Sequence, residues 1–144
     1  MSFVPPPVVK ASERLLVDVE IVVRRFARYH KYSIGSDLRA DAKTVARLAH
    51  RAWRDRSHQQ DLVAQLVRAV DDFKITLQLG SQVKAFPSFA QFEALARLVR
   101  DLGKQVGGWH RQHCTPKGQS AASDVSPQRA QILSTRAASI GANS

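Results

Sequence analysis

The sequence predicts an all-α protein, an antiparallel four-helix bundle whose helices run up, down, up and down, followed by a disordered C-terminal tail. Four segments carry apolar residues at alternating steps of three and four, the spacing that lines side chains along one side of an α-helix. The joints between these segments are short, which favours antiparallel neighbours. Sustained two-residue alternation rich in β-branched or aromatic residues, the pattern of a strand, is absent from the sequence.

The first helix is expected to begin directly after the three prolines at positions 5–7. Each proline fixes its own φ angle and disfavours helical conformation in the residue before it, so together they form an extended lead-in. The apolar side of this helix then follows with Leu15, Val19, Val22 and Phe26. Residues 29–36 break the pattern at Gly35, and Ser33 or Ser36 is expected to cap the next helix.

The second helix has an apolar seam of mostly small side chains, which allow close helix approach: Leu38, Ala42, Val45, Ala49 and Ala52. After a polar joint at 57–60, the third helix repeats the spacing with Leu62, Leu66, Ala69, Phe73 and Leu77. It is expected to end between residues 80 and 86. The fourth helix is expected to start at Pro87 and Ser88, and its apolar side consists of Phe92, Leu95, Val99, Leu102 and Val106.

One domain over residues 1–114 is expected, because 144 residues hold enough apolar side chains for a single core. From residue 115 the sequence turns to Ser, Ala, Gly, Pro and Gln, so residues 115–144 are expected to be a disordered tail. A single cysteine, Cys114, cannot form an internal disulfide and fits reducing surroundings. No segment is apolar enough to cross a membrane and the first residues do not resemble a signal peptide, so a soluble, cytoplasmic protein is expected.

The composition is strongly basic. The chain has 22 Lys and Arg against 12 Asp and Glu, a formal net charge of +10, and a pI near 10.7. The excess positive charges repel one another in the folded state, and a polyanionic partner would relieve this repulsion. RNA or DNA is the leading candidate, because each cation placed on a phosphate releases a counterion and adds sequence-independent affinity. An anionic membrane surface is the competing candidate.

Basic side chains of the second helix share an arc of about 80° on the side away from the apolar seam: Arg39, Lys43, Arg47, His50 and Arg54. Cations at these spacings repel one another by roughly 0.2 to 0.5 kcal/mol per pair, which Asp41 and Asp55 offset only in part. An external anion is therefore expected. The alternative interpretation is that these cations merely populate the solvated face.

A second basic group lies at the exit of the first helix and consists of Arg24, Arg25, Arg28 and Lys31. Tyr29 and Tyr32 are interleaved with these cations, and aromatic rings beside cations can stack on unpaired bases. Residues 1–57 contain 12 basic and 6 acidic side chains, a net charge of +6. The first helical hairpin is therefore the expected phosphate-facing half.

Patterns of catalytic or metal-binding chemistry are weak. The sequence contains no Gly-rich phosphate loop, no GxSxG nucleophile motif and no motif-placed pair of carboxylates, and Asp71 and Asp72 are expected to be solvated. His110, His113 and Cys114 have the chemistry of zinc ligands, but no second cluster completes a tetrahedral site. No enzymatic activity, cofactor or metal is therefore expected.

Three glycines in the fourth helix each cost about 1 kcal/mol relative to alanine, which suggests close packing or a helix end. Gly103 and Gly107 share one face where another backbone could approach, so a subunit contact is a reasonable hypothesis. Gly108 could end the helix and direct Trp109 sideways. Trp53 is expected to pack against neighbouring helices rather than to anchor a partner.

Two segments carry a family resemblance. The first is close to the pattern F-P-K-x-x-R-Y-T-L-G-x-x-L-R, with alanine at position 27 where proline is usual, and is matched by Phe26, Arg28, Lys31, Tyr32, Ser33, Ile34, Gly35, Leu38 and Arg39. The second is close to E-I-G-R-x-L-G-G-W and is matched by Asp101, Leu102, Gly103, Lys104, Val106, Gly107, Gly108 and Trp109. With these motifs the chain, over roughly residues 10–110, resembles the four-helix accessory proteins of diversity-generating retroelements and their relatives encoded in ribosomal RNA intervening sequences.

The resemblance implies a homo-oligomer, a pentameric barrel of bundles with a positively charged surface. Such a protein binds RNA or DNA together with the retroelement's reverse transcriptase, and assists mutagenic copying of template RNA without an active site of its own. In that scheme the expected phosphate contacts are Arg39, Lys43, Arg47, Arg51 and Arg54. The intervening-sequence relatives share the fold without a polymerase partner, so a basic RNA-binding or protein-docking bundle of that type is the alternative.

Overall fold

The fold is a bundle of α-helices, as the sequence predicts. The computed structural model describes residues 4–114, and this part of the chain contains helices and turns but no strand. In chain order the elements are α1 (Pro7–Val23), α2 (Arg28–Lys31), α3 (Ile34–Arg54), the 3₁₀ helix η1 (Arg56–His58), α4 (Gln59–Gln82) and α5 (Phe89–Cys114). The expected tail, residues 115–144, lies outside the described residues.

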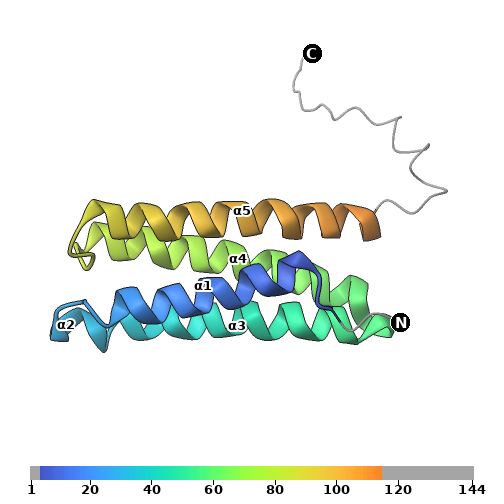
Figure 1. Cartoon of the computed structure of the whole chain (residues 1–144), viewed down its shortest axis with the longest axis horizontal. Coiled ribbons are helices and arrows are strands. Elements are labelled where there is room, and N and C mark those ends of the chain that lie inside the picture. Colours follow the sequence, from blue (N-terminus) through green and yellow to red (C-terminus); the bar gives the residue numbers. More distant parts are fainter. Residues whose placement is uncertain (1–3, 115–144) are drawn as a thin grey trace, which may run out of the picture. The chain divides into compact units, whose positions relative to one another are not determined.

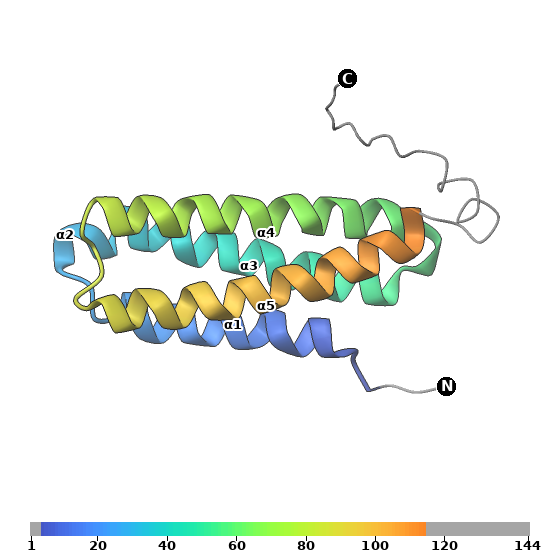
Figure 2. The same cartoon turned by 90° about the horizontal axis from the view of Figure 1, so that it is seen from above.

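The four long helices are antiparallel to their neighbours along the chain (Figure 1). α1 packs beside α3 and α3 beside α4, and α5 returns along α4. Figures 1 and 2 together place α3 and α5 at opposite corners of the bundle, with α1 and α4 at the other two. The outer sides of α3 and α5 therefore face away from each other.

The first helix begins one residue earlier than predicted, at the last of the three prolines. Pro7 occupies the first turn of α1, and the preceding residue is extended. Every predicted apolar residue of this segment is buried: Leu15, Val19, Val22 and Phe26. Ser12 is buried among them, and its hydroxyl donates to the carbonyl oxygen of Val9 at 2.7 Å. The polar group is thus satisfied inside its own helix and does not weaken the core.

The connection after α1 contains a short helix, α2, that the sequence pattern does not predict. Ser33 stands at the N-cap of α3 as expected, but its side chain makes no capping bond. Its hydroxyl donates instead to the carbonyl oxygen of Tyr29 at 2.9 Å, which closes the turn after α2. A Cβ at Gly35 would lie 2.9 Å from Cγ1 of Val23 and 3.0 Å from the carbonyl oxygen of His30. Glycine at position 35 therefore permits the close approach of α1, α2 and α3.

The contact between α3 and α4 uses the small seam that the sequence predicts. Ala42, Ala49 and Ala52 are fully buried. Thr76 on α4 donates its hydroxyl to Oδ2 of Asp41 at 2.6 Å. Nε2 of Gln59 donates to the carbonyl oxygen of Ala52 at 2.7 Å, near the other end of the contact. These two bonds fix the register of α4 along α3.

Aromatic rings close the end of the bundle where α4 turns into α5. The ring centroids of Phe26 and Phe86 are 5.1 Å apart and those of Phe86 and Phe92 are 5.5 Å apart, both edge to face. At the other end, α5 continues past Gly108 to Cys114, so the interpretation that Gly108 ends the helix is wrong. Packing of half-buried Trp109 against the core favours continuation by more than the roughly 1 kcal/mol that one glycine costs.

Candidate nucleic-acid interface

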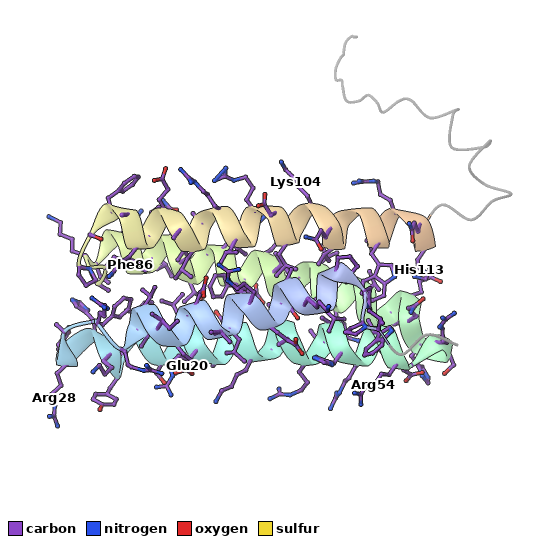
Figure 3. All side chains as sticks on the ribbon, viewed as in Figure 1. Glu20, Arg28, Arg54, Phe86, Lys104 and His113 are labelled. Atoms are coloured by element: carbon purple, nitrogen blue, oxygen red, sulfur yellow. The ribbon has the colours of Figure 1, made fainter. Side chains whose placement is uncertain are left out.

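The outer side of α3 carries a row of solvated cations. Lys43, Arg47, Arg51 and Arg54 are all exposed, and within residues 4–114 none of them forms an ion pair. We call these four residues the α3 strip. The helix that carries them has 21 residues and is therefore about 30 Å long. Figure 3 shows Arg54 projecting from the outer side of this helix, away from α5.

Two other members of the predicted ladder turn toward α1. Nε of Arg39 donates to Oε2 of Glu20 at 3.0 Å, and Nε2 of His50 lies 2.7 Å from Oε2 of Glu13. Both pairs join α3 to α1, because the two glutamates lie on the side of α1 that faces α3. The ladder is therefore divided: Arg39 and His50 have an acidic neighbour, whereas the α3 strip makes no ion pair within the described part of the chain.

The C-terminal half of α3 borders an open groove that the sequence pattern does not predict. Its volume is about 980 Å³, and it is lined by Ala46, Arg47, His50, Arg51, Arg54, Asp55, His58, Asp61, Leu62 and Gln65. Apolar spacing puts Leu62 in the core, yet this side chain is only half-buried, and the adjacent Val63 takes the core position. Three arginines of α3 thus face a hollow whose other wall comes from η1 and α4.

The groove is also lined by two acidic residues, Asp55 and Asp61, and the charge of Asp55 is used locally. Asp55 accepts hydrogen bonds from the hydroxyl of Ser57 at 2.8 Å and from the backbone N–H of His58 at 3.2 Å. Its Oδ2 also lies 3.0 Å from Nδ1 of His58. The Ser57 hydroxyl, followed by the His58 imidazole, holds the pKa of Asp55 below its ordinary value of 3.8. This carboxylate caps η1 and so offsets the groove arginines only in part.

Trp53 packs beside the groove, as expected from the sequence. It is half-buried against the hydrophobic core, and the guanidinium carbon of Arg54 lies 5.7 Å from its ring centroid. A cation over an aromatic face is attracted by the ring quadrupole. The indole therefore orients one groove arginine while remaining part of the core.

The second basic group lies at the other end of α3, around α2. Its members Arg24, Arg25 and Arg28 are exposed, and Lys31 is half-buried. Tyr29 and Tyr32 are 81% and 69% exposed, so their rings are open to solvent. The guanidinium carbon of Arg28 lies 6.0 Å from the Tyr32 ring centroid. We call Arg28, Tyr29 and Tyr32 the α2 corner. Figure 3 shows Arg28 projecting on the same side of the bundle as Arg54.

Gly103 and Gly107 of α5 lie toward α4 of the same chain. The space over Gly103 is occupied by α4 of the same chain, through the side chains of Lys74 and Val70. Gly107 lines the same small hollow between α4 and α5. Gly108 and Trp109 are half-buried, and Trp109 packs against the core. These glycines therefore allow α4 and α5 of the same bundle to lie close together.

Within the described residues, no group of three or more His, Cys, Asp and Glu side chains could hold a metal ion. Nor does any helix of this part of the chain have the length and hydropathy of a membrane span. The chain matches no protein-family model, no curated protein and no solved structure.

Proposed function

We propose that this protein is a non-catalytic, nucleic-acid-binding accessory subunit that holds single-stranded RNA along α3. The observation that carries the proposal is the α3 strip: four exposed cations on one helix, none with an ion-pair partner among residues 4–114. Phosphates are the complementary ligand, because each one bound releases counterions and relieves repulsion within the row. The groove arginines would hold the backbone at one end of the strip.

The α2 corner supports a single strand rather than a duplex. Tyr29 and Tyr32 present exposed rings beside Arg28, and unpaired bases stack on such rings, whereas paired bases cannot reach them. The corner precedes α3 and the groove lies along its C-terminal half, so the two are about 20 to 30 Å apart along the helix. A strand spanning both would be held by phosphate contacts throughout and by stacking at one end.

The polymerase partner and the oligomer are proposed from the family resemblance. In that scheme the bundle is a subunit of a homo-oligomer, a pentamer, and presents template RNA to a reverse transcriptase in the cytoplasm. α4 supplies an apolar surface for a protein contact, since Ile75, Leu79 and Val83 are 58%, 49% and 51% exposed at steps of four. Replacing Leu79 with Glu should abolish co-purification with the reverse transcriptase and leave RNA binding intact.

The RNA-binding proposal is tested with two variants of equal charge. The first replaces Arg47, Arg51 and Arg54 with glutamine and so empties the groove of its arginines. The control replaces Arg14, Arg68 and Lys84, which are exposed elsewhere on the bundle, with glutamine. Affinity for an oligouridylate is measured as a function of salt concentration. The slope of log affinity against log salt should fall by about 0.7 for each phosphate of the single strand that the variant no longer binds.

The groove variant should lose affinity and salt dependence, whereas the control variant should bind nearly as the parent does. Equal reductions in both variants would mean that net charge alone attracts RNA and that the α3 strip is not the site. Failure of the parent protein to retain RNA at about 0.1 M salt would refute RNA binding altogether. A chain that binds RNA but no reverse transcriptase would fit the intervening-sequence relatives instead.

A further inference from the structure

A lysine of α4 reaches across to α5 at a glycine. Nζ of Lys74 lies 3.0 Å, and its Cε 3.5 Å, from where a Cβ on Gly103 would be. Any side chain at position 103 would compete with the ammonium group for this space. Gly103 therefore lets a cation of one helix settle on the surface of the next.

Two further cations lie on α5 within about one turn of this glycine. Arg100 precedes Gly103 by three residues and Lys104 follows it directly, and both are exposed. Neither they nor Lys74 form an ion pair within residues 4–114. Asp71 lines the same hollow of about 50 Å³, and exposed Asp101 lies between Arg100 and Lys104 along α5, so the three cations and two aspartates together keep a net charge of +1. We call Lys74, Arg100 and Lys104 the α5 cluster.

Arg100 and Lys104 are four residues apart on one side of α5, and Lys74 reaches the glycine next to Lys104. Like charges so placed repel one another, and an external anion would relieve the repulsion. Protein partners need buried apolar or aromatic anchors at the centre of a contact. From residue 90 to residue 110, α5 exposes no large hydrophobic side chain, although Phe89 at the start of α5 and Ile75, which follows Lys74 on α4, are exposed. The chemistry of this face therefore fits a phosphate backbone better than an acidic protein.

The α5 cluster and the α3 strip lie on opposite sides of one bundle. In Figure 3 Lys104 projects from α5 in one direction and Arg54 projects from α3 in the other. We propose that the α5 cluster is a second phosphate-binding face, so that a single bundle holds two segments of nucleic acid at once. This inference rests on the proposed RNA binding, and it adds a bridging activity to it.

The test is the number of RNA molecules bound per chain. The probe is an oligouridylate of about ten nucleotides, within the range that one binding groove covers. Binding is titrated by calorimetry at low salt and expressed as RNA molecules per chain. Three variants are compared with the parent protein: K74Q/R100Q/K104Q, R47Q/R51Q/R54Q and the control R14Q/R68Q/K84Q. Circular dichroism and melting curves verify that each variant folds.

The parent and the control should bind two equivalents per chain, and each of the other two variants should bind one. If the parent binds one equivalent of RNA and R47Q/R51Q/R54Q binds none, the second face is overturned and the proposed function stands. Binding of two equivalents of RNA by K74Q/R100Q/K104Q would also overturn the second face. So would binding of polyglutamate, in place of RNA, to the α5 cluster. Absence of RNA binding to the parent would remove both the second face and the proposed function.

Discussion

Nε of Arg39 on α3 lies 3.0 Å from Oε2 of Glu20 on α1, and the side chains are 40% and 32% exposed. Ion pairs this exposed stabilise a fold by only about 0.2 to 1 kcal/mol. A phosphate can therefore replace the glutamate at little cost. We therefore propose Arg39 as a further phosphate contact beside the α3 strip.

Replacing Glu20 with glutamine should release Arg39 and raise affinity for single-stranded RNA by up to about fivefold, the equivalent of about 1 kcal/mol. The free energy of unfolding should fall by no more than the same amount. Filter binding and urea denaturation measure the two effects. Asp72→Asn removes an equal charge from an exposed site on α4 and serves as the control. Equal increases in both variants would exclude a specific role for Arg39.

Replacing Tyr29 and Tyr32 with alanine should weaken binding of single-stranded RNA, because base stacking on an aromatic ring contributes about 1 to 3 kcal/mol per base. Duplex binding should change little, since paired bases do not stack on protein rings. Competition between labelled strands and duplexes measures the difference. Phenylalanine at both positions keeps the stacking surface and should restore binding. Weak binding that phenylalanine does not restore would show that the rings do not stack.

Replacing Gly35 with alanine should destabilise the bundle by about 1 to 3 kcal/mol, because the new methyl group would overlap Val23 and the carbonyl oxygen of His30. The free energy of unfolding in urea measures the change. Ser36→Ala alters the exposed neighbouring position and should stay within about 0.5 kcal/mol of the parent. An alanine variant as stable as the parent would show that α1 and α2 can move away from α3 at this position.

Replacing Asp55 with asparagine should lower the melting temperature modestly at neutral pH. The pKa of Asp55 is lower in the folded protein than its ordinary value of 3.8, so its charge stabilises the fold above that pH. This contribution is lost as the pH falls below 3.8 and through the folded-state pKa, where the Asp55 carboxyl becomes protonated and therefore neutral, as the asparagine amide is. Melting curves from neutral to strongly acidic pH should therefore converge at the acidic end. A difference that persists unchanged would point to an effect other than charge.

Local periodicity predicts much of this fold, and tertiary contacts decide the rest. The buried seam of α3, Ala42 to Ala52, follows from spacing alone, because side chains three and four residues apart share one side of a helix. Spacing also predicts three of the four exposed cations, Lys43, Arg47 and Arg54, whereas Arg51 is expected from the family resemblance. Spacing does not predict the Glu20 partner of Arg39, the position of Leu62 in the groove wall or the approach of Lys74 to Gly103. Each of these depends on how one helix is placed along another.

The short joint η1 has a consequence for the order of folding. α3 and α4 are separated by four residues, so closing this hairpin costs little chain entropy, and contacts local in sequence form early. The groove is built from this hairpin alone, so a growing polypeptide could complete it before α5 has left the ribosome. Pulse-labelling hydrogen exchange during refolding should accordingly protect the amides of α3 and α4 before those of α5.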